Sequence, residues 1–193
     1  AVPPARSDES SPAPRPLPDG YDRHDPKAAE QRVALATVLD GLDLVSVGYR
    51  GLVDGLVALG RTDIPLARLA EGHVDALRIL GQAERQPVTD VWYGVWASRS
   101  QQTGLRAESV PDGLRIDGTL RFASGAGVLD RALIPVWLPD GSHLLLDLDV
   151  TALPVDPTVW RTAAMQASRS YELTVADVRV GRDAVVGKPD FYL

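Results

Sequence analysis

The chain has 193 residues, of which 45% are hydrophobic and 24% are charged, so it can bury a substantial core as one domain or two small ones. Its formal net charge of −6 and its scattered basic residues argue against a surface for nucleic acid or anionic lipid, because both require clustered Lys and Arg. The absence of cysteine excludes disulfides, thiolate metal sites and a cysteine nucleophile, which makes the cytoplasm the default compartment.

The sequence also gives no indication of a metal site or a membrane-spanning segment. The three histidines, His24, His73 and His143, lie far apart and fit no zinc-binding spacing. No apolar run approaches the roughly 18 residues of a membrane span, and the first residues lack the apolar stretch of a signal peptide. We therefore expect no metal and no membrane span.

Residues 1–26 are rich in proline, interspersed with Ser, Asp and Arg. Such a segment cannot bury enough apolar surface to offset its ordering entropy, so we predict a disordered tail. A ligand for a domain that binds polyproline helices is the alternative.

Residues 27–86 show helical periodicity and are predicted to form an N-terminal helical domain. The clearest helix begins after Thr62 or Asp63, which can cap it, and has Pro65 in its first turn. His73 lies on its apolar stripe, where a buried, hydrogen-bonded histidine is more common than a catalytic one. We therefore favour a structural role for His73.

Residues 87–187 change to short extended segments separated by turn signals, which predicts a middle β-domain. The expected fold class is α+β, with an N-terminal α-helical subdomain followed by an antiparallel β-sandwich or barrel of six or seven strands. The expected strands are Val91–Ser98, Leu114–Phe122, Ala132–Leu138, His143–Leu148, Val159–Ala163 and Tyr171–Val180.

Two of these strand ends carry an aromatic residue and a small hydroxyl residue. They are Trp96-Ala97-Ser98 and Phe122-Ala123-Ser124. A flat ring with one apolar and one polar edge, such as a flavin, would need an aromatic wall together with hydroxyl and backbone donors. On the pattern alone, core aromatics and serines that end strands are the better explanation.

The order of several motifs resembles the acyl-CoA dehydrogenase family over roughly residues 28–193. The helix from Asp63 to Leu77 resembles the one that some divergent members place before the β-domain. Gly118 to Ser124 resembles the second flavin strand of the family, and Met165 to Leu173 resembles the closing segment of its β-domain. The resemblance implies FAD as cofactor, bound by Trp96, Ala97, Ser98, Phe122, Ala123 and Ser124, with Phe122 as the wall and the two serines as donors.

The resemblance further implies α,β-dehydrogenation of an acyl-CoA thioester. In this family a carboxylate removes the α-proton, the β-hydride passes to the flavin, and electrons leave to an electron-transferring flavoprotein. The three candidate glutamates are assigned to surfaces: Glu71 to a solvated helix face, and Glu108 and Glu172 to strand surfaces. We therefore name no catalytic base in this chain and expect it in a C-terminal helical domain that would begin at residues 188–193.

Two departures from the family limit this reading. The Gly-Ser-Asp segment of the family is absent from Gln101 to Arg106, and Arg99 replaces the usual glutamate. A non-catalytic or degenerate flavin-binding subunit of a heteromeric dehydrogenase is therefore the first alternative, and a β-sandwich binding module on a helical stalk is the second. The apolar faces of the first two helices predict a homo- or hetero-oligomer.

Overall fold

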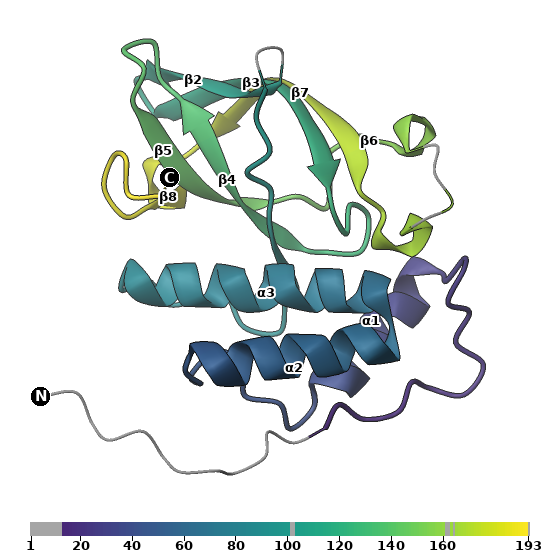
Figure 1. Ribbon diagram of the computed structural model, residues 1–193. Helices are drawn as coiled ribbons and strands as arrows, with labels where there is room; N and C mark the ends of the chain where they lie inside the picture. Colours follow the sequence, from purple (N-terminus) through teal and green to yellow (C-terminus); the bar gives the residue numbers. More distant parts are fainter. Residues whose placement is uncertain (1–12, 101–102, 161–162, 164, 193) are drawn as a thin grey trace, which may run out of the picture.

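The computed structural model describes residues 13–100, 103–160, 163 and 165–192, and it places a layer of helices beneath a curled sheet (Figure 1). The helices are α1 (Ala28–Leu39), α2 (Tyr49–Thr62) and α3 (Ile64–Gln82). Three helices followed by strands confirm the predicted α+β class. In the described part of the chain, no helix has the length and apolar character needed to cross a bilayer.

Helix α3 starts where the sequence predicts. The Asp63 side chain accepts a hydrogen bond from the backbone N–H of Leu66 at 2.8 Å, and Pro65 occupies the first turn. An acidic cap and an early proline both favour a helix N-terminus, because they satisfy or remove amide donors that have no partner within the helix. The cap thus fixes where α3 begins beneath the sheet.

Helix α3 also joins the two layers. A Cβ atom at Gly72 would lie 3.8 Å from Cα of Gly94 in strand β1 (Tyr93–Val95), at van der Waals contact distance, so helix and strand pack closely here. One residue further along, Nδ1 of His73 accepts a hydrogen bond from the backbone N–H of Tyr93 at 3.1 Å. The predicted structural role of His73 is therefore confirmed: it ties the helix to the first strand.

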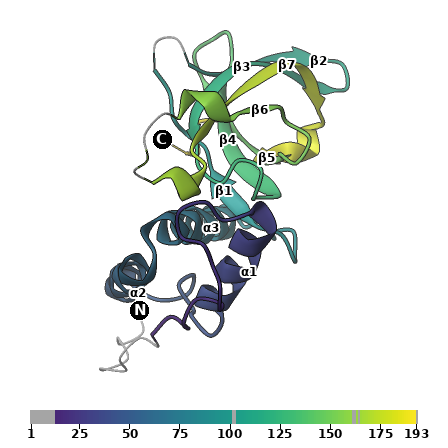
Figure 2. The same cartoon turned by 90° about the vertical axis from the view of Figure 1, so that its right-hand side faces the viewer.

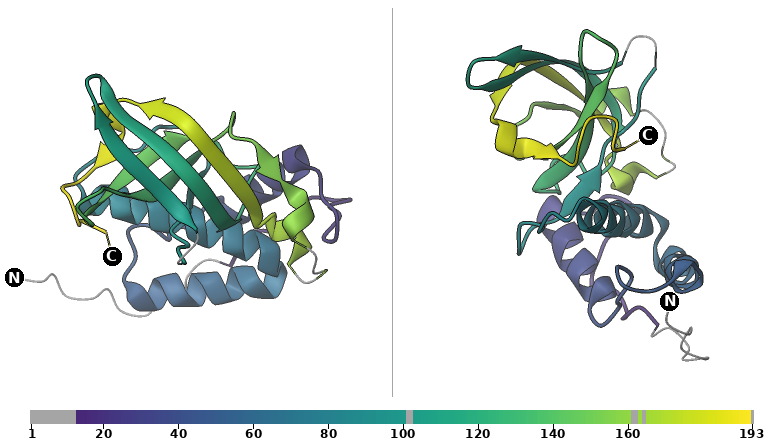
Figure 3. Two further views of the ribbon diagram at one scale, coloured as in Figure 1. Left: turned by 90° about the horizontal axis from the view of Figure 1, so that it is seen from above. Right: turned by 90° about the vertical axis from the view of Figure 1, so that its left-hand side faces the viewer.

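The strands form one continuous sheet in the order β6-β7-β3-β2-β4-β5-β8, with β1 added against β4 (Figure 2). The remaining strands are β2 (Gly104–Val110), β3 (Gly113–Ala123), β4 (Arg131–Trp137), β5 (His143–Asp149), β6 (Val155–Asp156), β7 (Tyr171–Val180) and β8 (Val185–Val186). Pairing is antiparallel except between β1 and β4 and between β2 and β4. Figure 3 shows the sheet curling over on itself, so it is closer to an open barrel than to a two-sheet sandwich.

Three strand predictions need correction. The predicted strand Val159–Ala163 is wrong where the structure describes it: β6 ends at Asp156, whose side chain caps a 3₁₀ turn over Pro157–Val159. Proline cannot donate to a sheet ladder, which explains this end. Strand β2 was not predicted, although its buried Leu105 and Ala107 alternate with exposed Arg106 and Glu108, as is typical of a half-buried strand. Strand β1 is shorter than predicted.

The segment before α1 also differs from prediction. Residues 1–12 lie outside the described residues, but residues 13–26 run along the helical layer without regular structure. Leu17 and Tyr21 pack against the hydrophobic cluster of the helices, and Arg15 pairs with Asp40 at 2.6 Å. Two apolar side chains thus give this segment contacts that its proline content does not predict.

A fully buried carboxylate anchors the sheet near the far end of α3. Asp147 on β5 accepts a hydrogen bond from Nε of Arg131 at 2.7 Å and one from the Tyr93 hydroxyl at 3.3 Å. Arg85, just beyond α3, places a guanidinium nitrogen 3.6 Å from the same carboxylate. Every oxygen of Asp147 therefore has a cationic or hydroxyl partner, as a buried charge requires. We call these four residues the Asp147 cluster.

One face of α2 is not covered by the residues that the structure describes. Tyr49, Val53 and Val57 recur at intervals of four residues and are exposed. This stripe agrees with the apolar face expected from the sequence. The oligomer that it suggests stays a prediction.

Candidate functional site

A β-bulge near the end of β3 turns an aromatic side chain out of the sheet. Leu120 pairs with Leu173 and Ala123 pairs with Tyr171, so two residues of β3 oppose the single residue Glu172 of β7. The second bulge residue, Phe122, has φ +60° and is 60% exposed. A bulky residue in the left-handed region is strained, and such strain concentrates at functional positions.

Phe122 borders a cavity of about 360 Å³ at this edge of the sheet. The ring of Trp160 meets it edge to face, with the centroids 6.3 Å apart. On the polar side, Nε of Arg121 donates to Oε2 of Glu172 at 2.7 Å. The cavity is lined by Arg121, Phe122, Val159, Trp160, Ser170 and Glu172. It therefore combines an aromatic wall with a charged and hydroxylated edge.

The other predicted aromatic, Trp96, has a different place. Its indole is buried in the core of the sheet, and its Nε1–H donates to the backbone carbonyl of Ser124 at 2.9 Å. Trp96 therefore joins the two predicted strand ends, but Phe122 is the predicted aromatic that faces the cavity. Ala97 and Ser98 are half-buried just beyond β1 and do not line this cavity.

Ser124 belongs to a buried row of hydroxyls. Its Oγ lies 2.9 Å from Oγ of Ser170, which lies 2.9 Å from Oγ of Ser168. The Ser168 hydroxyl in turn donates to the backbone carbonyl of Met165 at 2.7 Å. Ala123, between Phe122 and Ser124, is fully buried. Of the predicted residues, Phe122 thus lines the cavity directly, and Ser124 is linked to it through Ser170.

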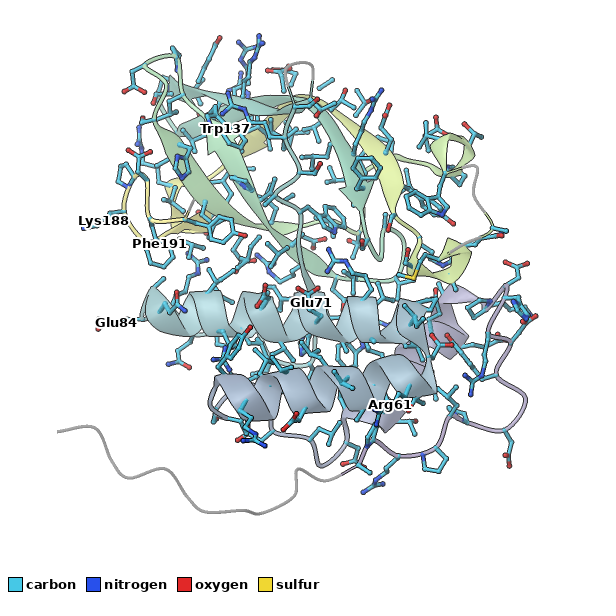
Figure 4. All side chains as sticks on the ribbon, in the orientation of Figure 1. Arg61, Glu71, Glu84, Trp137, Lys188 and Phe191 are labelled. Atoms are coloured by element: carbon cyan, nitrogen blue, oxygen red, sulfur yellow. The ribbon has the colours of Figure 1, made fainter. Side chains whose placement is uncertain are left out.

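The glutamates do not all lie where the sequence suggested. Glu108 is an exposed residue of β2, paired with Arg115, as expected. Glu172 lies on β7 and is partly exposed, and it also lines the cavity and pairs with Arg121. Glu71 lies midway along α3 in Figure 4, half-buried beside Arg68, and burial raises its pKa. Each of these two carboxylates is thus engaged by an arginine side chain.

Several cavity residues were missed. Trp160 was placed on a strand that does not form, and Ser170 had appeared only as part of a resemblance. The indole Nε1 of Trp160 is buried without a hydrogen-bond partner among the described residues. A buried N–H group of this kind usually has a hydrogen-bond partner, so this one could donate to a ligand atom.

No family model and no curated protein matches this sequence. Solved structures do share its fold. Indole-bound TdsC from Paenibacillus sp. A11-2, also described as dibenzothiophene monooxygenase, is 18% identical with a TM-score of 0.62, over 84% of this chain and 45% of its own. XiaF from Streptomyces sp., solved with FADH2 and glycerol, is 18% identical with a TM-score of 0.60, over 86% and 45%.

A third structure, the HsaA monooxygenase from M. tuberculosis, is 14% identical with a TM-score of 0.61, over 82% of this chain and 49% of its own. The chain therefore spans about half the length of the solved proteins that it resembles. At these identities the likeness shows that the chain shares the fold of these three proteins.

Proposed function

We propose that this chain forms the flavin-binding part of a flavin-dependent oxidoreductase, with the flavin ring packed against Phe122 beside Ser124 and Ser170. The bulge that exposes Phe122 carries this proposal, because a strained and exposed aromatic next to a cavity has no evident role in stability. Flavin-bound neighbours of the same fold support it.

The residues around the cavity fit a flavin in chemistry and size. Its volume of about 360 Å³ is within the range of small-molecule sites, roughly 300–1,000 Å³. Phe122 and Trp160 suit the apolar part of the ring, and the polar edge formed by Ser170 and the Arg121–Glu172 pair suits its heteroatoms. A bound flavin would supply the two-electron chemistry, while these residues hold and orient the ring. FAD is our first choice, and FMN is the alternative.

Monooxygenation is the reaction that we propose to test first. TdsC and HsaA are named as monooxygenases, and XiaF was solved with a reduced flavin. In the described part of the cavity, the carboxylate present is Glu172, which is engaged by Arg121. This arrangement offers no free base for removing the α-proton of an acyl thioester.

Acyl-CoA dehydrogenation is the second candidate, favoured by the sequence motifs around Ser124 and Met165. It requires a base from another part of the assembly, an acyl-CoA substrate and an electron-transferring flavoprotein as acceptor. A degenerate subunit that binds flavin without turnover is the third.

Flavin uptake tests the binding part of the proposal. We would express the natural gene through to its stop codon and titrate the protein with FAD and with FMN. Phe122→Ala should weaken binding about tenfold, because it removes the aromatic face. Tyr49→Ala, an equally aromatic but remote and exposed change on α2, should leave binding unaltered. Failure of the wild-type protein to bind either flavin would overturn the proposal.

Two assays then separate the reactions. Reduced flavin, oxygen and indole should give an oxygenated indole product if the protein is a monooxygenase. Bleaching of oxidised flavin by saturated acyl-CoAs without oxygen would instead establish dehydrogenation. A protein that binds flavin but is silent in both assays would be the degenerate subunit.

A further inference from the structure

Residues 187–192 lie across the seam between the sheet and α3, and we call this segment the strap. Phe191 and Tyr192 of the strap pack against the hydrophobic cluster that joins the two layers, and Figure 4 shows Phe191 between the sheet and the C-terminal end of α3. This cluster takes Ala76, Ile79 and Leu80 from α3, and Leu133, Leu145 and Val186 from the sheet. Release of the strap would therefore expose apolar surface of the seam.

His143, the first residue of β5, attaches the strap to the sheet. The His143 N–H donates to Oδ1 of Asp190 at 3.0 Å, and the Asp190 N–H donates to the His143 carbonyl at 3.0 Å. The imidazole makes two further contacts. Its Nδ1 lies 2.8 Å from Oδ1 of Asp190, and its Nε2 contacts the backbone carbonyl of Tyr192. His143 therefore holds the strap with both its backbone and its ring.

Both ring nitrogens of His143 face acceptors. An ionised carboxylate and a backbone carbonyl have no proton to donate, so each nitrogen must carry a proton to form a hydrogen bond. A neutral imidazole has one N–H and one lone pair, whereas the imidazolium form has two N–H groups. The geometry of the closed strap therefore fits the protonated ring. A neutral ring would turn a lone pair toward one of the two oxygens.

A neighbouring indole also favours a cation at this position. Trp137 is paired with His143 across β4 and β5, and the two ring centroids are 6.0 Å apart. The face of a tryptophan attracts a positive charge at about this distance. Only 12% of the His143 side chain is exposed, so water offers the ring few alternative partners.

The other charges on this side of the molecule are engaged elsewhere or exposed. Arg99 stacks over Trp137, 4.0 Å from the ring centroid, and its positive charge acts against protonation of His143. Asp140, in the turn before β5, accepts hydrogen bonds from within that turn. Lys188 of the strap is exposed. Asp190 is therefore the charged partner that the structure gives to the His143 ring.

Helix α3 presents further titratable groups to the strap. Burial, together with Asp75 and Glu71 of α3, raises the pKa of the Tyr192 hydroxyl. This hydroxyl therefore stays protonated near neutral pH. The strap contact that changes its protonation in this range is the one at the His143 ring.

We propose that His143 makes the strap a pH-sensitive closure of the seam. When the ring is protonated, both of its N–H groups bind the strap and the seam stays covered. Loss of one proton places a nitrogen lone pair against an oxygen, so the strap loosens as the pH rises through the titration of His143. This proposal is independent of the flavin site, because none of the strap residues lines the cavity at Phe122.

Amide hydrogen exchange measured by NMR tests the proposal. The amides of Asp190 and Phe191 report on the strap, because both donate to backbone carbonyls when it is closed. Their protection factors should fall about tenfold between about pH 6 and about pH 8.5, which lie on either side of the usual histidine titration. The amide of Val150, which donates to the Asp130 carbonyl just beyond the other end of β5, should keep its protection.

Two variants assign the effect to the imidazole and its carboxylate. His143→Gln does not titrate, so protection of the strap amides should be weaker at the lower pH and should not change with pH. Asp190→Asn suits the left-handed backbone there, φ +56°, and its amide can donate to a neutral imidazole. This variant should keep its protection at the higher pH. Glu71→Gln and His24→Gln, the latter at an exposed histidine, are controls that should retain the wild-type fall.

Equal protection of the strap amides at both pH values in the wild-type protein would overturn the proposal. A fall that His143→Gln or Asp190→Asn retains in full would also overturn it, because the fall would then come from another group. A fall that extends to Val150 would show a general loss of stability in place of strap release, and would likewise contradict the proposal. Flavin binding is not the readout, so each of these results leaves the proposed function standing.

Discussion

The Asp147 cluster and the Phe122 cavity both place polar groups on strands of the same sheet, but they differ in how completely those groups are paired. Around Asp147, two arginines and a tyrosine satisfy one carboxylate. Around Phe122, an aromatic ring is exposed and strained, and the Trp160 donor has no partner among the described residues. Complete pairing of buried polar groups indicates a structural role, whereas a buried donor without a partner indicates a ligand site.

The largest expected effect concerns the fully paired Asp147 cluster. Asp147→Asn should lower the free energy of unfolding by about 3 kcal/mol, because it removes the fully buried charge that pairs with the half-buried Arg131 guanidinium. Asp149→Asn, two residues along the same strand but exposed, should cost less than about 1 kcal/mol. Urea denaturation of both variants measures the difference, and equal losses would contradict the structural role of the cluster.

A second prediction concerns pH at the junction of α3 and β1. Burial lowers the pKa of His73 from 6.5 to about 4, so the unfolded chain binds the proton more readily than the folded one. The contribution of His73 is therefore complete above pH 6.5 and is lost as the pH falls toward 4. At pH 5 the loss should be about 2 kcal/mol.

His73→Gln isolates this effect, because glutamine can keep an acceptor for the Tyr93 N–H but does not titrate. The difference in unfolding free energy between the wild-type protein and this variant should change between pH 7 and pH 5. A constant difference over that interval would show that His73 does not couple the helix to the strand as described.

The smallest expected effect has the opposite sign. Phe122→Asn should raise the free energy of unfolding by about 0.5–1 kcal/mol, because asparagine tolerates the left-handed backbone better than phenylalanine does. Thermal melting of the two proteins would show it. A loss of stability would mean that Phe122 contributes to packing, and the contrast with the Asp147 cluster would weaken.

The sequence predicted the features that depend on neighbouring residues. The cap at Asp63 and the run of α3 are local signals. Even the structural role of His73 follows from helical spacing. These predictions succeed because each depends on residues within about one turn of one another.

The cavity could be predicted only in part, because it depends on the pairing register of strands β3 and β7. Phe122 faces outward because of a bulge between β3 and β7, and no spacing within either strand reveals that bulge. Ser170 lies 46 residues from Ser124 in the sequence. The sequence therefore singled out Ser124, whereas its contact with Ser170 is seen only in the folded chain.

An experimental structure of the full-length protein with bound flavin would test the central claim most directly. Our account predicts that the ring contacts Phe122 and that a ring nitrogen lies within hydrogen-bonding distance of Ser124 or Ser170. A flavin bound elsewhere, with the cavity at Phe122 filled by the protein's own side chains, would contradict the account.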